Sequence, residues 1–498
     1  MLQMAKEMDA TRAENLERSV KEKMADYIDN YYRHGAHFRF LIIEFAHLLG
    51  RNYWTRVWII QEFAVSPKLQ IRCGQFTIPF EYLQVTYMFL RLATHEISGR
   101  LRKQLGTGDW MNDPNITILS SVFMSGIPSA DGKAPQIMGM RQTYQNAGPE
   151  AQSTRASLAH ILASVYVSGT LGATDQRDRI YALLGMAGDV DALELRTEYD
   201  PAVSCETVFT SAARAMLTTG HVDLLAFSQF SVDRRQKPPA ELARELPSWV
   251  PDWRTSILEP YGGRILVSGE TPFVASGELA FKKPQSFQND VPKDCVKLLG
   301  FRVDVVEAIA GEWGTEPSLS SLEERRAYLS DIEEFCRRSD AMKEETGVDV
   351  YLKSSDRQDA RAFVPVAGQG IYGVGFRGRA TQAVRDGYSL TLDDIRRRAR
   401  GDDPEFDLRP RDYYHSLMAS QRFRRPFLSA KGFVGLVPGN SLPGDLIVVF
   451  LGGKLPYVLR GDEHVKEGYS FVGEAYVHGI MYGELSDRDP VIEEIVLK

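Results

Sequence analysis

A change of sequence pattern near residues 236–239 divides the chain into two parts that differ in their expected secondary structure. Before this point the apolar residues recur mostly at helical spacing. After it, short runs rich in β-branched and aromatic residues alternate with glycine and proline. The 498 residues are enough for two or three domains with substantial cores. We therefore predict an α+β protein with a mainly α-helical N-terminal half and a β-rich C-terminal domain, a small sandwich or barrel.

The same patterns predict the individual elements and the domain limits. Helices are expected at residues 10–33, 38–50, 54–66, 79–97, 157–166, 178–184 and 205–219, with a strand at 69–73. Residues 107–148 are rich in Gly, Pro, Asn and Ser without a clear period, which predicts a long, mobile loop. Strands are expected at residues 264–267, 295–299, 433–436, 446–450, 455–459 and 469–477, with helices at 318–338 and 411–422. The predicted domains are residues 1–75, 76–235 and 236–498.

The segment 53–64, with the sequence Y-W-T-R-V-W-I-I-Q-E-F-A, combines two tryptophans with a glutamate. On a continuous helix, Trp54, Trp58 and Glu62 would lie on adjoining faces. A carboxylate buried beside aromatic rings is costly unless it is paired or used, so Glu62 is the first functional candidate. The simpler interpretation, which we prefer from the residues alone, is an amphipathic core helix whose Gln61–Glu62 end meets solvent.

Four segments of the chain resemble motifs of the fungal heterokaryon incompatibility (HET) family. The segment R-V-W-I-I-Q-E-F-A resembles the closing helix of the HET domain. Three later segments are also similar to the family: T-D-Q-R-D-R-I-Y-A-L-L-G at 174–185, L-P-S-W-V-P-D-W at 246–253 and G-E-A-Y-V-H-G-I-M-Y-G-E at 473–484. The residues that carry the resemblance are Arg56, Trp58, Gln61, Glu62, Asp175, Arg177, Asp178, Arg179, Tyr181, Trp249, Asp252, Trp253, Gly473, Glu474, Tyr476, His478 and Gly479.

The chain also departs from the family pattern. HET domains open with a strand motif similar to A-L-S-Y-x-W-G and continue with L-W-I-D-x-x-C-I-N-Q, and this sequence has neither motif. We therefore interpret residues 1–75 as the C-terminal remnant of a HET domain, truncated at its N-terminal side. The HET fold resembles TIR domains, which makes this remnant TIR-like.

The likeness to plant-type TIR enzymes implies a possible catalytic role for Glu62 in cleaving the glycosidic bond of NAD. In that comparison the glutamate contacts the nicotinamide ribose or stabilises an oxocarbenium-like centre, while Trp58 or Tyr53 stacks on a base. The first βα units, whose loops line the nucleotide, lie in the missing motifs, and a carboxylate alone does not position a substrate. We expect no complete catalytic site and no cofactor, and NAD enters only as the substrate of this alternative.

Composition and charge exclude several other function classes. The net charge of −7 and the lack of a basic stripe argue against a nucleic-acid partner, although Arg-rich runs occur at 396–400 and 422–425. The four cysteines lack C-x-x-C spacing, which is typical of a reduced, cytoplasmic protein and predicts no metal site. No apolar run is long enough to span a membrane.

The leading interpretation follows from the family resemblance. It implies a cell-death-related protein of non-self recognition that acts as an interaction module, with other proteins, including a non-self or allelic partner, as its partners.

Overall fold

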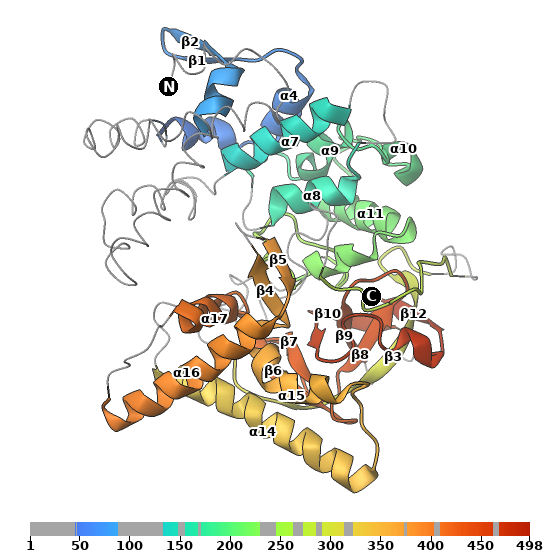
Figure 1. Cartoon of the computed structure of the whole chain (residues 1–498). Coiled ribbons are helices and arrows are strands. Elements are labelled where there is room, and N and C mark those ends of the chain that lie inside the picture. The colour runs from blue at the N-terminus through green and yellow to red at the C-terminus, as the bar shows by residue number, and fades with distance from the viewer. Residues whose placement is uncertain are drawn as a thin grey trace. The chain divides into compact units, whose positions relative to one another are not determined.

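The structure is a computed structural model, shown in Figure 1. It describes residues 45, 47–87, 133–147, 155–167, 171–229, 246–261, 272–284, 291–312, 322–372, 376–402, 409–461 and 468–498. The chain separates into two compact units, Met1–Asp191 and Ala192–Lys498. The first unit is mainly helical and the second contains the large sheet, so the predicted α+β class is confirmed. The predicted helix at 10–33 and strand at 264–267 lie outside the described residues.

The described residues of the first unit form helices and a β-hairpin. Its elements are η1 (Asn52–Thr55), α4 (Trp58–Val65), β1 (Gln70–Cys73), β2 (Phe76–Pro79), α7 (Lys133–Ala147), α8 (Leu158–Tyr166) and α9 (Asp178–Leu184), and α10 (Val190–Leu193) crosses into the second unit. Trp54, Phe63 and Phe80 pack edge-to-face in series, with ring centroids 5.4 and 5.0 Å apart. This stack of buried aromatic rings joins η1, α4 and the helical residues after β2 into one core.

The segment 53–64 is not one continuous helix, which corrects the sequence prediction. Trp54 lies in η1, and the backbone at Arg56 is extended, with φ −88° and ψ 136°. Arg56 forms a parallel bridge with Gly172, and the amide of Val57 donates a hydrogen bond of 3.0 Å to the Gly172 carbonyl. These bonds to a distant segment replace the local helical bonds, so α4 begins only at Trp58.

Residues 133–147 form α7, so the prediction of a mobile loop over 107–148 is wrong for this part, and residues 107–132 and 148 lie outside the described residues. Ala134, Ile137 and Met138 bury one side of α7. The guanidinium of Arg141 donates hydrogen bonds to the carbonyls of Phe63 (2.7 Å), Ser66 (2.5 Å) and Pro67 (3.3 Å), beyond the last turn of α4. Tertiary contacts therefore override the weak helical propensity of this segment.

In the second unit, a closed barrel is built around one long strand, β3 (Val296–Ile309). Its large sheet also contains β6 (Arg424–Ser429), β7 (Val434–Pro438), β8 (Leu446–Phe450), β9 (Pro456–Gly461), β10 (Tyr469–Glu474), β11 (Tyr476–Val477) and β12 (Glu493–Leu497). The strands pair in the order β3-β12-β10-β9-β8, and β8 pairs again with β3, which closes the ring. The end of β3 leaves the ring and pairs with β6, so β6, β7 and β11 continue the sheet. Of the two predicted β architectures, the structure has the barrel.

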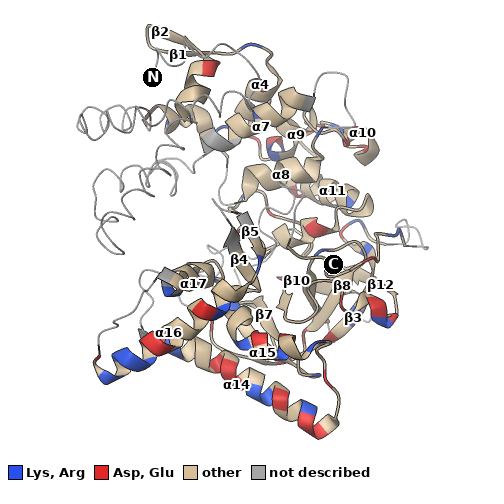
Figure 2. Ribbon diagram, viewed as in Figure 1, with Lys and Arg blue, Asp and Glu red and all other residues tan. Residues whose placement is uncertain are grey.

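Helices pack beside the extended part of this sheet. They are α14 (Leu322–Thr346), α15 (Ser354–Phe363), α16 (Gln382–Arg400) and α17 (Arg409–Ala419), together with η7 (Val364–Val366) and the hairpin of β4 (Gln369–Tyr372) and β5 (Phe376–Arg379). Acidic and basic side chains are mixed along α14 and α16 (Figure 2). The prediction identified α14 and α17 but missed the helices α15 and α16 and the strands β2, β4, β5, β6 and β12.

Residues 192–229 group with the barrel, whereas the prediction placed them with the helical residues 76–235. This stretch contains α11 (Cys205–Thr218) and η4 (Val222–Phe227). Asp223 is buried and accepts a hydrogen bond of 2.8 Å from the amide of Lys454, before β9. Phe209 packs edge-to-face on Trp253, with ring centroids 5.1 Å apart. Packing contacts therefore set the boundary between the two units, and the change in composition near residue 236 does not reveal these contacts.

We expect Arg141→Met to lower the free energy of unfolding by about 2 kcal/mol, because three carbonyl groups lose a charged donor. The matched control is Gln142→Met, which introduces the same side chain at the adjacent, exposed position. Urea unfolding of the two variants measures the difference. An equal change in both would show that Arg141 does not hold α4 and α7 together.

Candidate functional site

A hydrogen bond joins two of the family-like motifs in the first unit. The indole N–H of Trp58, the first residue of α4, donates to Oδ2 of Asp178, the first residue of α9, at 2.9 Å. The two residues are 120 positions apart in the sequence. Asp178 is a first-turn acid, a position that the helix dipole favours. Trp58 is half-buried and its only ring donor is engaged within the fold.

The other residues of the motif at 174–185 organise the start of α9. Asp175 and Arg177 form an ion pair of 2.8 Å, and this hydrogen-bonded partner lowers the pKa of Asp175. Nε of Arg179 donates to Gln176 at 2.7 Å, while the Arg179 carbonyl accepts a hydrogen bond from the hydroxyl of Tyr166. Tyr181 is buried on the same helix. These contacts support the structural interpretation of this charge cluster.

Gln61, a third residue of the first motif, lies against the end of α9. A Cβ atom on Gly185 would lie 2.8 Å from Nε2 of Gln61. The side-chain amide of Gln61 therefore occupies the space that Gly185 leaves open because it has no side chain. Trp58 and Gln61 therefore both contact the segment 174–185 from α4. The two motifs form one structural junction.

Glu62 and Tyr53 do not belong to this junction. Glu62 is exposed, which confirms the simpler interpretation that this end of the helix meets solvent. Tyr53 is 46% exposed, and burial, followed by the negative charge of Glu62, raises the pKa of its hydroxyl. The structure thus brings Tyr53 within electrostatic range of Glu62, whereas Trp58 bonds to Asp178.

In the second unit, the L-P-S-W-V-P-D-W segment forms an irregular, largely buried strap. Trp249 and Trp253 are fully buried, and the indole N–H of Trp249 donates to the carbonyl of Asp294 at 2.9 Å. Asp252 pairs with Nε of Arg254 at 2.8 Å, and the same guanidinium reaches Glu206 at 2.6 Å. These bonds link the strap to α11 and to the residues that precede β3.

The motif at 473–484 contains a buried ion pair that the sequence did not reveal. Glu474, at the end of β10, accepts from Nη2 of Arg424 at 2.5 Å, and both side chains are buried. The carboxylate also accepts from the amide of Tyr261 at 3.0 and 3.1 Å, and the guanidinium lies 3.6 Å from the centre of the Tyr261 ring. Gly473 has a φ of +153°, and a Cβ there would meet Pro438 at 2.6 Å. The sequence showed Arg424 only as part of an Arg-rich run.

His478 is a buried histidine with both ring nitrogens bonded. Its Nε2 lies 2.6 Å from the carbonyl of Asp356, and its Nδ1 lies 2.8 Å from the hydroxyl of Tyr476. Because a carbonyl only accepts, Nε2 carries the proton and Nδ1 accepts from Tyr476 in the neutral ring. Burial lowers the pKa of His478. Gly479 has a φ of +88°, and the backbone there runs close to Tyr351. A Cβ atom on residue 479 would lie 2.5 Å from Cδ1 of Tyr351, so a larger residue would clash.

The motif residues therefore hold elements together. Within the described parts of the chain, no group of three or more His, Cys, Asp or Glu side chains is arranged to hold a metal ion. In the same residues, no helix is both long and apolar enough to cross a membrane. Glu62 is the one predicted catalytic residue, and its role stays a prediction.

The Trp58–Asp178 bond can be measured with a double-mutant cycle. Trp58→Phe keeps an aromatic ring but removes the donor, and Asp178→Ala removes the acceptor. We expect a coupling free energy of about 1–2 kcal/mol in unfolding measurements, because the acceptor is charged and the bond is partly buried. Strictly additive effects would contradict the junction.

His478 predicts a pH dependence of stability. Its folded pKa lies below the unfolded value of about 6.5, so the unfolded chain binds a proton that the folded chain excludes as the pH falls below that value. Stability contributed by the neutral ring is therefore present at pH 7 and is lost toward pH 5. We expect His478→Gln to flatten this dependence by at most about 1.4 kcal/mol per pH unit. His221→Gln, in the same unit, is the control, and an unchanged slope in His478→Gln would refute the assignment.

A comparison with known protein families covers the strands and the buried ion pair of the second unit that are described above. Residues 402–494, which contain the strands β6 to β11 and the Arg424–Glu474 pair, match the Het-6 beta-barrel domain family. The chain is 26% identical, over 482 aligned residues, to heterokaryon incompatibility protein 6, OR allele, of Neurospora crassa. That match covers 89% of this chain and 66% of the relative's own length, and no solved structure matches. The domain match, the relative and the motifs agree in their similarity to heterokaryon incompatibility proteins.

Proposed function

We propose that the chain acts as a protein-interaction module in fungal non-self recognition and in the cell-death response linked to it. The similarity to a heterokaryon incompatibility protein supports this role. Because the match spans 66% of that relative, the activity of the whole relative is part of the proposal. We place the protein in the cytoplasm, with other proteins, including an allelic or non-self partner, as its binding partners.

The observation that carries this proposal is that several polar side chains of the family-like motifs, the exposed Glu62 not among them, bond to each other or to the chain itself. Trp58 bonds to Asp178, Glu474 to Arg424, and His478 to Tyr476. A catalytic acid, base or nucleophile must reach a substrate, and a bonded, buried group does not. Motifs of this kind support a scaffold that presents surfaces to a partner.

A TIR-like NAD glycohydrolase is the alternative function, and the geometry around Glu62 favours it specifically. The carboxylate is exposed and therefore accessible, and the exposed Tyr53 is close enough for the charge of Glu62 to affect its hydroxyl. In this alternative Glu62 acts on the ribose side of the bond, and Tyr53 or Trp58 stacks on a base. The nucleotide-binding segments would come from a partner or from a longer form of the protein.

Expression of the full chain in a fungal host separates the two functions. We expect growth arrest and cell death when the chain meets an incompatible partner strain, with no fall in cellular NAD. Glu62→Gln and the matched control Glu81→Gln, another exposed carboxylate of the same unit, are expected to behave like the wild type.

The two possible failures of this experiment are distinct. A fall in NAD with the wild type and with Glu81→Gln, but not with Glu62→Gln, would establish the glycohydrolase. If a panel of incompatible strains gave no growth arrest, the recognition role would be wrong.

A further inference from the structure

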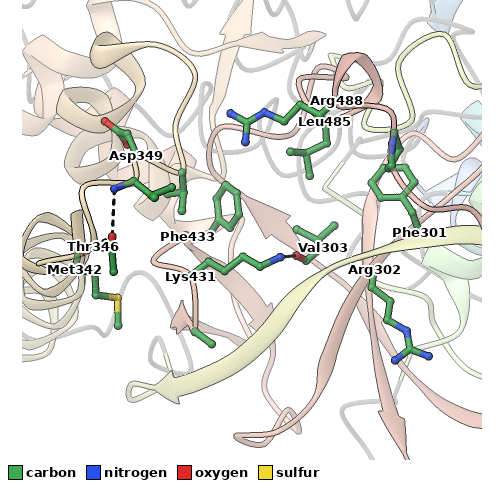
Figure 3. A pocket seen from close by; sticks show the side chains of 14 residues that line it. Phe301, Arg302, Val303, Met342, Thr346, Asp349, Lys431, Phe433, Leu485 and Arg488 are labelled. Carbon is green, nitrogen blue, oxygen red and sulfur yellow. Dashed lines mark hydrogen bonds between the residues drawn. The ribbon is translucent and has the colours of Figure 1, made fainter. Parts of the chain in front are cut away.

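A cavity of about 490 Å³ opens between β3, the C-terminal end of α14 and the segment 485–490 (Figure 3). None of its lining residues belongs to the residues that carry the family resemblance. Its size lies within the range of about 300–1,000 Å³ that small-molecule sites occupy. Apolar side chains form much of the wall, namely Phe301, Val303, Met342, Phe433 and Leu485. Phe301, Val303 and Phe433 are also part of the barrel core, so the floor of the cavity is the outer edge of that core.

The charged groups of the cavity leave an excess of positive charge. Asp349, the one acid in the lining, pairs with Arg357 at 2.7 Å and with Lys343 at 2.9 Å, so its charge is compensated. Nζ of Lys431 donates to the carbonyl of Val303 at 2.7 Å, and the backbone amide of Lys431 donates to the buried carboxylate of Asp304 at 2.7 Å. In the described part of the chain, Arg488 forms no ion pair, and Figure 3 shows its guanidinium extending over the cavity.

The backbone next to Arg488 is strained. Asp489 has a φ of +50° and ψ of +60°, a left-handed conformation that is uncommon for a residue other than glycine. It precedes Pro490, which itself lines the cavity and disfavours compact conformations of the preceding residue. Strained residues persist only where the surroundings hold them, and they gather at ligand sites. Asp489 thus forms part of the turn that carries Arg488 and Pro490 to the cavity.

We propose that this cavity binds a small apolar molecule with one anionic head group, such as a monocarboxylic acid. The apolar body contacts Phe301, Phe433 and Leu485, and the head group faces Arg488, with Lys431 as a second cation of the wall. A charge-assisted hydrogen bond from a guanidinium to a carboxylate is the strongest polar contact that these groups can offer. The site is separate from the motif residues.

Calorimetric titration of the full chain with octanoate and with 1-octanol tests this proposal. The two probes share the same alkyl length and differ in charge. We expect octanoate to bind the wild type about tenfold more tightly than 1-octanol, since one charge-assisted bond corresponds to about that factor. Arg488→Gln is expected to abolish this preference and to leave the binding of 1-octanol unchanged.

Two further variants make the outcome decisive. The matched control is Arg396→Gln, which changes an exposed arginine of α16 that pairs with Asp393 at 3.4 Å. This variant should bind both probes like the wild type. Thr346→Trp adds bulk at an exposed lining position and should weaken both probes together. Thermal unfolding verifies that each variant is folded. Equal binding of both probes by the wild type, or octanoate binding that survives Arg488→Gln and Thr346→Trp unchanged, would overturn the proposal.

Discussion

The buried pair of Arg424 and Glu474 is the interaction on which the second unit depends. Two charges removed from water are stable only if their remaining hydrogen-bonding capacity is met, and here the Tyr261 amide and ring and the Gln421 side chain meet it. Arg424 is the first residue of β6, a strand that does not belong to the closed ring. Glu474 is the last residue of β10, which is a strand of the ring. The pair therefore fixes where the extended part of the sheet leaves the barrel.

Elements with a strong local signal could be predicted from the sequence. The helices α8 and α11 follow Ser157 and Ser204, whose side chains cap them, and α9 begins with the acid Asp178. The strands of the barrel also have short apolar runs with clear turns. In contrast, α7 depends on Arg141 contacting α4, and α16 on ion pairs such as Arg385 with Asp359. Those partners are distant in the sequence, so no local pattern predicts them.

The same reasoning applies to the candidate site. The sequence identified the motif residues but not their pairings, because Trp58 and Asp178, or Arg424 and Glu474, meet only after folding. The hypothesis of a buried catalytic Glu62 assumed one helix from Trp54 onward. The bridge between Arg56 and Gly172 interrupts that helix, so Trp54 does not share a helix with Glu62. Glu62 still lies four residues after Trp58 on α4, and it is exposed there.

Motifs that hold a fold together identify a family without locating its function. When a tryptophan donor or a carboxylate is already bonded inside the protein, a partner must be recognised by other residues. Surfaces built from residues outside the motifs can differ between related proteins while the scaffold persists, and discrimination between self and non-self requires such differences. The cavity beside β3 is an example of a surface built from residues outside the motifs. Arg488 and Lys431 carry its charge, and neither belongs to a motif. For the proposed role in recognition, the residues that select a partner are therefore to be sought on surfaces where polar groups remain available.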